Sequence, residues 1–152
     1  MILVDTSVWI DLLNGKLGHL VTPQALVQFC TCGPIVQEVR QGLREGAGGE
    51  ALGEALLALP RLSDPLPFET FLEAAELFRQ GRRRGYTIRS SADCLIAAVA
   101  IQNRVPVWHQ DRDFTAIARY TALRTWSPRG KLGYRVTQDT ALRTWSPLKK
   151  IQ

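Results

Sequence analysis

The sequence lacks the features of a zinc protein, a membrane protein or an exported protein. Its 152 residues include only three cysteines, and no paired Cys or His ligands stand at both ends of a loop, as structural zinc sites require. No apolar run approaches the ~20 residues of a membrane-spanning helix, since the stretch 95–101 is too short. The apolar start has no basic region ahead of it, so we expect no signal peptide and a cytoplasmic location. The three cysteines are expected to be buried thiols.

The residues that are present give a globular composition with a basic excess. Hydrophobic residues make up 45% and charged residues 22% of a length that suits one domain. With 19 basic and 14 acidic side chains the formal charge is +5, which favours polyanionic partners, nucleic acid first among them. The cluster Arg82, Arg83 and Arg84 is a candidate nucleic-acid contact, although such clusters are usually solvated helix ends.

Short apolar runs alternate with helical patterns along the chain. The run 1–4 is uninterrupted, as in a strand of a buried parallel sheet. We expect the strands at 1–4, 29–32, 105–108 and 123–126, with an edge strand at Leu62. Apolar residues at helical spacing predict helices over 8–13, 23–28, 34–43, 50–59, 68–78, 90–99 and 114–118. This alternation predicts an α/β fold with three layers, α/β/α, around a central parallel sheet.

The C-terminal part contains an exact repeat. The eight residues 121–128 recur letter for letter as residues 140–147. One repeat of this length is too little for a solenoid, so we expect only one copy to form the last strand of the sheet. The sequence therefore predicts one domain over residues 1–128 and a C-terminal tail, 129–152, that contains the second copy.

Acidic residues recur where predicted strands end. Asp5 follows the first strand, Asp111 follows a later strand, and Asp93 opens the helix before that strand. Because the carboxyl ends of parallel strands gather at one edge of a sheet, we expect these carboxylates to meet, with Glu38 leaning over the same edge. Four such charges repel one another, and a divalent cation such as Mg²⁺ or Mn²⁺ relieves the repulsion. Such a site can polarise a phosphodiester and lower the pKa of an attacking water.

Each of these acids also has a purely structural explanation. Asp5 is a candidate helix N-cap, as are Thr6 and Ser7. Asp93 completes a capping-box-like pattern with Ser90, and the acids of the segment 111–113 suit a turn and a helix cap. The glutamate fits an ordinary solvated helix position. The recurrence of the acids at strand ends, rather than their number, favours a functional site.

Four segments in order resemble the motifs of a known family, the PIN-domain nucleases. They are Asp5-Thr6-Ser7-Val8-Trp9-Ile10-Asp11, Val36-Gln37-Glu38-Val39, Asp93-Cys94-Leu95-Ile96-Ala97-Ala98 and Asp111-Arg112-Asp113-Phe114. The short length, and Gly42-Leu43 after the glutamate, look most like the VapC-type toxins of bacterial and archaeal toxin–antitoxin pairs. The resemblance extends from residue 1 to about residue 126.

The resemblance implies a Mg²⁺- or Mn²⁺-dependent endoribonuclease, usually a homodimer, that a cognate antitoxin protein silences. Residue by residue, it implies an acidic site of Asp5, Glu38, Asp93 and Asp111. We expect Asp5 and Asp93 to hold the principal metal, Asp111 to share it directly or through water, and Glu38 to orient the attacking water or act as a general base. Supporting roles fall to Thr6, Ser7 and Asp113.

Other acidic-pocket proteins fit less well. A phosphatase that forms an aspartyl-phosphate normally has Asp-x-Asp after the first strand, and here Ser7 occupies the second acidic position. A phosphoacceptor receiver domain needs a paired acid after the first strand and a lysine at a late strand end, and neither is present. A binding or regulatory module with an acidic pocket and no nuclease activity stays the alternative to the nuclease.

Overall fold

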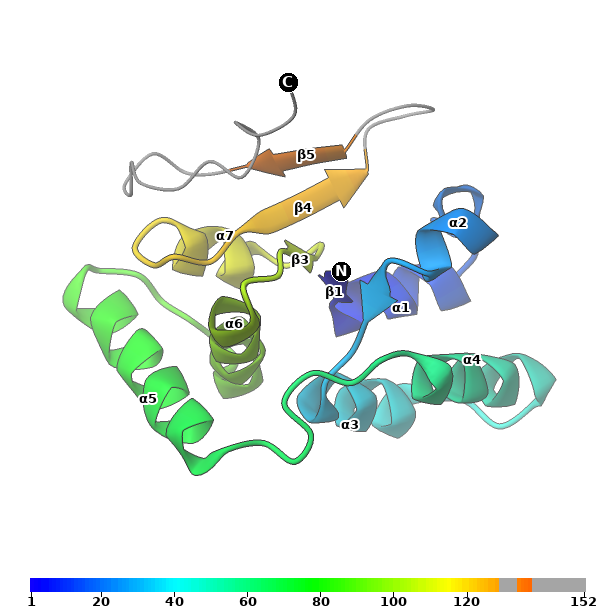
Figure 1. Cartoon of the computed structure of the whole chain (residues 1–152), viewed down its shortest axis with the longest axis horizontal. Coiled ribbons are helices and arrows are strands. Elements are labelled where there is room, and N and C mark those ends of the chain that lie inside the picture. Colours follow the sequence, from blue (N-terminus) through cyan, green and yellow to red (C-terminus); the bar gives the residue numbers. More distant parts are fainter. Residues whose placement is uncertain (129–133, 138–152) are drawn as a thin grey trace, which may run out of the picture.

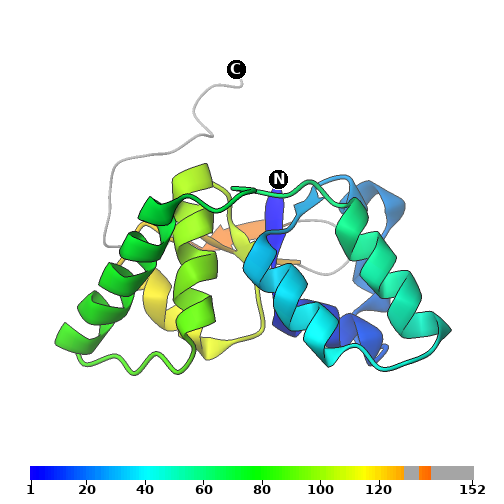
Figure 2. The ribbon, with the colours of Figure 1, turned by 90° about the horizontal axis from the view of Figure 1, so that it is seen from below.

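The computed structural model describes residues 1–128 and the backbone of residues 134–137. Its centre is a five-stranded sheet in the order β2-β1-β3-β4-β5 (Figure 1). The strands are β1 (Ile2–Val4), β2 (Phe29–Cys30), β3 (Val107–Trp108), β4 (Thr125–Pro128) and β5 (Tyr134–Thr137). The first four are parallel, and β5 runs antiparallel to β4. The predicted parallel α/β architecture is therefore confirmed, with helices covering the sheet in three layers (Figures 1 and 2).

The parallel strands are apolar because both faces of the sheet are covered. Leu3 of β1 pairs with Cys30 of β2 on one side and with Val107 of β3 on the other, and all three side chains are fully buried. Cys32 and Cys94 are also buried and free, as expected for thiols that only pack. This central part of the sheet carries the first catalytic candidate at the end of β1.

The helices follow the predicted order. They are α1 (Thr6–Leu13), α2 (Pro23–Leu26), α3 (Gly33–Gly42), α4 (Ala47–Ala58), α5 (Phe68–Arg83), α6 (Ser91–Asn103) and α7 (Arg112–Ala118), with a 3-10 turn at Gly18–Leu20. Helix α6 lies in the interior beside α5, and its residues Ile96 to Ala100 are buried on every side. None of the helices in the described ranges combines the length and apolar character that a membrane span requires.

Helix α5 has its apolar residues on an unexpected side. Phe68 is 70% and Leu72 is 58% exposed, whereas the buried side chains are those of Thr70, Ala74 and Leu77. Close packing against the neighbouring helix favours small residues, and this leaves the large ones outside. The spacing of the apolar residues correctly predicts a helix in this segment, but it does not identify the face of the helix that is buried.

Three boundaries differ from the expectations. Helix α4 begins at Ala47, three residues before the predicted start, and its first turn includes Gly48 and Gly49. The predicted edge strand at Leu62 is reduced to one isolated bridge between Thr31 and Arg61. The first repeat copy supplies β4, as predicted, but β5 is an additional strand within the predicted tail. The second copy, 140–147, lies outside the described residues.

Candidate active site

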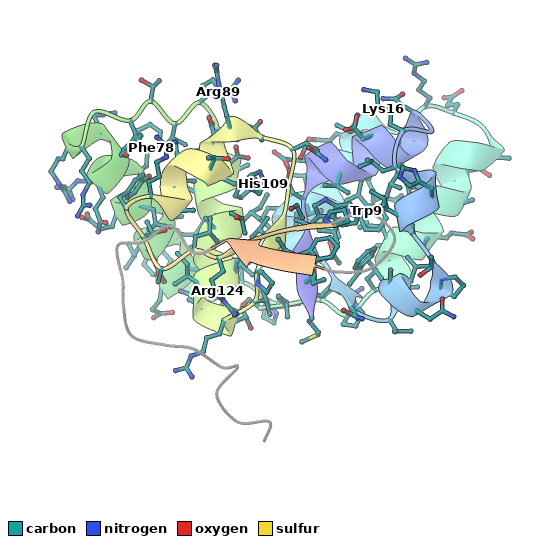
Figure 3. All side chains as sticks on the ribbon, turned by 90° about the horizontal axis from the view of Figure 1, so that it is seen from above. Trp9, Lys16, Phe78, Arg89, His109 and Arg124 are labelled. Atoms are coloured by element: carbon teal, nitrogen blue, oxygen red, sulfur yellow. The ribbon has the colours of Figure 1, made fainter. Side chains whose placement is uncertain are left out.

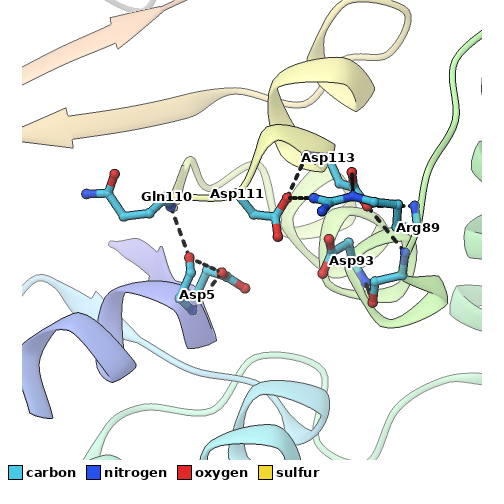
Figure 4. Close-up of polar contacts among 8 residues, drawn as sticks. Asp5, Arg89, Asp93, Gln110, Asp111 and Asp113 are labelled. Carbon is cyan, nitrogen blue, oxygen red and sulfur yellow. Dashed lines mark hydrogen bonds and ion pairs between the residues drawn. The ribbon is translucent and has the colours of Figure 1, made fainter. Parts of the chain in front are cut away.

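Asp5 occupies the junction between β1 and α1. Its side chain is 3% exposed and caps α1, because Oδ2 accepts hydrogen bonds from the Ser7 amide at 3.0 Å and the Ser7 hydroxyl at 2.5 Å. Of the three candidate N-caps, Asp5, Thr6 and Ser7, the acid is the one that caps α1. Burial raises the pKa of Asp5, and the hydrogen bonds from Ser7 oppose this rise. Ser7 Oγ also accepts from the Gln110 amide at 3.0 Å, which joins the ends of β1 and β3 (Figure 4).

Glu38 comes to the site from α3. The Thr6 hydroxyl donates to Glu38 Oε2 at 2.8 Å, although the two residues are 32 positions apart. Helix α3 turns this face inward because Ile35 and Val39 are buried in the core, one on each side of the glutamate along the helix. The glutamate is therefore held beside the end of β1 and is not an ordinary solvated residue.

Asp93 is the acid with the most perturbed environment. It lies in the first turn of α6, after Ser90, whose hydroxyl accepts from the Asp93 amide at 3.4 Å. Its side chain is 7% exposed, and Oδ2 has no hydrogen-bond partner within the part of the chain that the structure describes. Burial, followed by the charges of Asp5, Asp111, Asp113 and Glu38, raises the pKa of Asp93 to about 7. All four other acids therefore lie close enough to act on this one carboxyl.

Asp111 and Asp113 stand at the start of α7. Asp111 is the N-cap, and its Oδ1 accepts from the Asp113 amide at 2.9 Å. Asp113 is 2% exposed. One oxygen from each of Asp93, Asp111 and Asp113 can lie within 4.8 Å of the others, so the three form a group of cation-ligand size. Figure 4 shows Asp5, Asp93 and Asp111 directed toward the same region.

This group of three acids differs in one member from the metal set predicted from the sequence. Asp113 joins Asp93 and Asp111, whereas Asp5 acts on Asp93 through its charge. The choice of metal ligands among these acids stays a prediction.

Arg89 is a site residue that the sequence reasoning missed. Its guanidinium Nη2 lies 2.7 Å from Asp111 Oδ1, and its Nε lies 3.1 Å from Asp113 Oδ1. Its backbone amide donates to Asp113 Oδ2 at 2.7 Å (Figure 4), and its side chain lies at the edge of the molecule in Figure 3. The only signal in the sequence was a basic residue immediately before the Ser90 cap, and a single charge before a cap is too common to indicate a site.

The cluster Arg82 to Arg84 lies at the exposed end of α5. Arg83 pairs with Glu76 at 2.5 Å, and Arg82 lies over the ring of Phe78 at 5.3 Å. These contacts are within α5 and do not reach the carboxylates. A nucleic-acid role for this cluster stays a prediction.

The donor set fits a hard divalent cation. Several carboxylates converge, and the buried Oδ2 of Asp93 needs a partner that none of the described residues supplies. A divalent cation satisfies that oxygen and neutralises the mutual repulsion of the acids. Oxygen ligands of this kind suit Mg²⁺ or Mn²⁺ and leave room for a phosphate.

The fold and the acidic edge of the sheet define a known class of protein. The profile of the PIN domain family matches residues 2–120, and the chain belongs to this family. Within it, the chain is 35% identical over 138 residues to Ribonuclease VapC11 of Mycobacterium tuberculosis, an alignment that covers 85% of this chain and 100% of the relative.

Two solved structures share the fold. One is a member of the VapBC family of toxin-antitoxin systems, VapBC-5, from Mycobacterium tuberculosis, with 26% identity and a TM-score of 0.55 over 76% of this chain and 88% of that one. The other is VapBC2 from Rickettsia felis bound to a DNA fragment from its promoter, with 16% identity and a TM-score of 0.57 over 84% of this chain and 100% of that one.

Proposed function

We propose that the protein is the toxin of a toxin–antitoxin pair and acts as a Mg²⁺- or Mn²⁺-dependent endoribonuclease that hydrolyses phosphodiester bonds in RNA. The observation that carries the proposal is the environment of Asp93, a buried carboxyl with one unpartnered oxygen among four other acids. A buried carboxyl with a purely structural role is expected to have both oxygens hydrogen-bonded, and Asp93 Oδ2 has no such partner among the described residues. The ribonuclease names of the relatives support the same activity.

The carboxylates divide into ligands and a base. Asp5, Asp93 and Asp111 are the proposed metal ligands, with Asp113 adjoining them. A divalent cation held there supplies Lewis acidity, which polarises the phosphodiester and stabilises its developing negative charge. Glu38 is held by Thr6 with one oxygen, which leaves the other to orient the attacking water and take its proton.

Arg89 and Ser7 position the acids. Arg89 binds both acids at the start of α7, and Ser7 joins Asp5 to the end of β3. Residues held in this way keep the ligands near their productive geometry before substrate binds.

The proposal includes protein partners. We propose a cognate antitoxin that silences the protein in the cytoplasm, and a homodimer as the working form. The neighbouring structure VapBC-5 is described as a member of the VapBC family of toxin-antitoxin systems, and VapBC2 carries the same VapBC name. The exposed apolar side chains Phe68, Phe71 and Leu72 on α5 offer a surface that a protein partner can cover. Light scattering of the purified chain, alone and with the product of the adjacent gene, tests both interactions.

The decisive experiment combines metal binding with RNA cleavage. Antitoxin-free protein is melted in EDTA, in Mg²⁺ and in Mn²⁺, and each sample is assayed on single-stranded RNA. We expect both ions to raise the melting temperature with concentration, because they bind the folded state alone, and to switch on cleavage. Absence of both effects overturns the nuclease and favours the alternative, an acidic-pocket binding or regulatory module.

A further inference from the structure

A groove of about 520 Å³ lies between the chain that follows α5 and the outer side of α7. Six of its lining residues carry the argument, namely Tyr86, Arg89, Arg112, Asp113, Thr115 and Arg119. Three of these are arginines, and only one is an acid. The groove is therefore basic, in contrast to the acidic site beside it.

Two arginines lie along one side of α7, one at its first residue and one at its C-cap. Arg112 and Arg119 are seven residues apart, which is close to two helical turns, so their side chains emerge on the same side of α7 about 10 Å apart along its axis. Both residues are exposed. A guanidinium binds a phosphate with two parallel hydrogen bonds, so a row of arginines suits successive phosphates of a strand.

Arg89 and Asp113 join the groove to the acidic site. Both residues line the groove, and the guanidinium of Arg89 also reaches Asp111 at 2.7 Å. A strand that lies along α7 therefore arrives at the carboxylates without leaving the basic surface. An acidic site needs such a surface, because its own charges repel a polyanion until a cation is bound.

We propose that this groove is the subsite that binds phosphates of the single-stranded RNA substrate next to the cleavage site, with Arg112 and Arg119 as the phosphate-binding residues. This inference rests on the proposed function. RNA is favoured over an acidic peptide because the groove continues into the carboxylate site. Tyr86 forms a fixed wall of the groove, since its ring stacks on that of Tyr120 at 5.3 Å.

The test compares Arg112→Gln/Arg119→Gln with a matched loss of charge elsewhere. Arg40→Gln/Arg44→Gln removes two exposed arginines, one in the last turn of α3 and one just after its C-cap, and serves as the control. Arg112→Gln alone is included in case the double variant folds poorly. Binding of a fluorescent single-stranded RNA is measured in EDTA over a salt series that starts at low salt, and cleavage and metal-dependent melting are measured in Mg²⁺.

We expect the Arg112→Gln/Arg119→Gln protein to bind RNA at least ~10-fold more weakly than wild type, with a lower kcat/KM. The slope of log Kd against log salt concentration should fall by about 1.4, because each phosphate contact to a single strand contributes roughly 0.7. The shift in melting temperature on adding Mg²⁺ should be unchanged, since the carboxylates are intact. The control pair should match wild type in Kd and slope.

Four results overturn the inference. The first is an unchanged salt slope in the folded Arg112 variants, and the second is an equal loss in the control pair. The third is a defect confined to antitoxin binding, measured by light scattering with the adjacent-gene product, which assigns the groove to that protein. The fourth is absence of RNA binding by wild type at low salt. Failure of the proposed function is distinguishable, because it appears in wild type as missing metal-dependent melting and cleavage.

Discussion

Arg89 holds Asp113 through both its backbone and its side chain. Its amide donates to Asp113 Oδ2 at 2.7 Å, and its Nε donates to Oδ1 at 3.1 Å. The Ser90 amide adds a bond to Oδ2 at 3.3 Å. Since Ser90 caps α6, these contacts fix the start of α6 against α7 and so place Asp93 beside Asp111. The spacing of the acids depends on this link between two segments that are 24 residues apart.

Replacing Arg89 should show that its positive charge compensates the acids. We expect Arg89→Gln to lower the melting temperature in EDTA, because Asp111 and Asp113 lose their common counter-charge. The loss should be smaller in Mg²⁺, since a bound cation supplies positive charge to the same group. Arg89→Lys keeps the charge and serves as the control, and its melting temperature in EDTA should fall less than that of Arg89→Gln. Equal destabilisation of both variants in EDTA and in Mg²⁺ contradicts a compensating role.

Removing the hydroxyl of Thr6 should affect catalysis more than stability. Thr6→Val keeps the shape of the side chain but removes the 2.8 Å hydrogen bond that orients Glu38. We expect cleavage to fall by roughly 10- to 100-fold, the usual cost of losing a residue that orients a site group, with a nearly unchanged melting temperature. Thr6→Ser retains the hydroxyl and should retain most of the activity. Full activity in folded Thr6→Val would falsify the role of this contact.

Asp93→Asn should leave the fold intact and remove activity. The amide can occupy the same position in the first turn of α6, while the metal site loses one ligand charge. We expect RNA cleavage to fall by more than ~100-fold and the melting shift on adding Mg²⁺ to shrink. Circular dichroism verifies the fold. Cleavage at the wild-type rate by the folded variant means that Asp93 is only a structural residue.

The stability of metal-free protein should depend on pH through Asp93. Burial and the neighbouring acids raise the pKa of Asp93 from 3.8 to about 7, so the folded state holds this proton more tightly than the unfolded chain. The resulting stabilisation is fully present below about pH 4 and is lost as the pH rises through about 7. We therefore expect the Asp93 contribution in EDTA to decline between about pH 4 and about pH 7.

Asp93→Asn provides the comparison for this effect. In EDTA, the melting temperature of wild type should fall relative to that of Asp93→Asn as the pH rises. The affinity of wild type for Mg²⁺ should increase as the pH rises, because the cation binds the deprotonated carboxylate. A difference that is constant across this pH range contradicts the raised pKa.

Two truncations test the C-terminal boundary. From the sequence we expect a chain that ends after Pro128 to fold and to cleave RNA. β5 pairs with β4 through Thr137, so ending the chain after Pro128 leaves the edge of β4 unpaired. We therefore expect this chain to be active but to melt at a lower temperature than one that ends after Thr137. If the chain that ends after Thr137 is inactive, the segment with the second repeat copy belongs to the domain.

Much of the fold is predictable because its signals are local. The apolar run 1–4 indicates a buried parallel strand by itself, and Ser90 followed by Asp93 marks the start of α6. The position of Glu38 follows from its place between two apolar residues of a helix. By contrast, Phe68 and Leu72 are exposed because the side of α5 that packs against α6 favours small residues. The sequence of α5 by itself does not indicate which of its sides faces α6.

The sequence alone determined the class of fold, the order of its elements and the acids that stand at strand and helix ends, because apolar periodicity and capping involve residues close together in the chain. Only the tertiary structure decided how those acids are grouped. It grouped Asp113 rather than Asp5 with Asp93 and Asp111, brought Arg89 between two of these acids, and put a basic groove beside the acidic site. These relationships join segments that lie far apart in the chain, and packing of α6 and α7 against the sheet sets the distances between them.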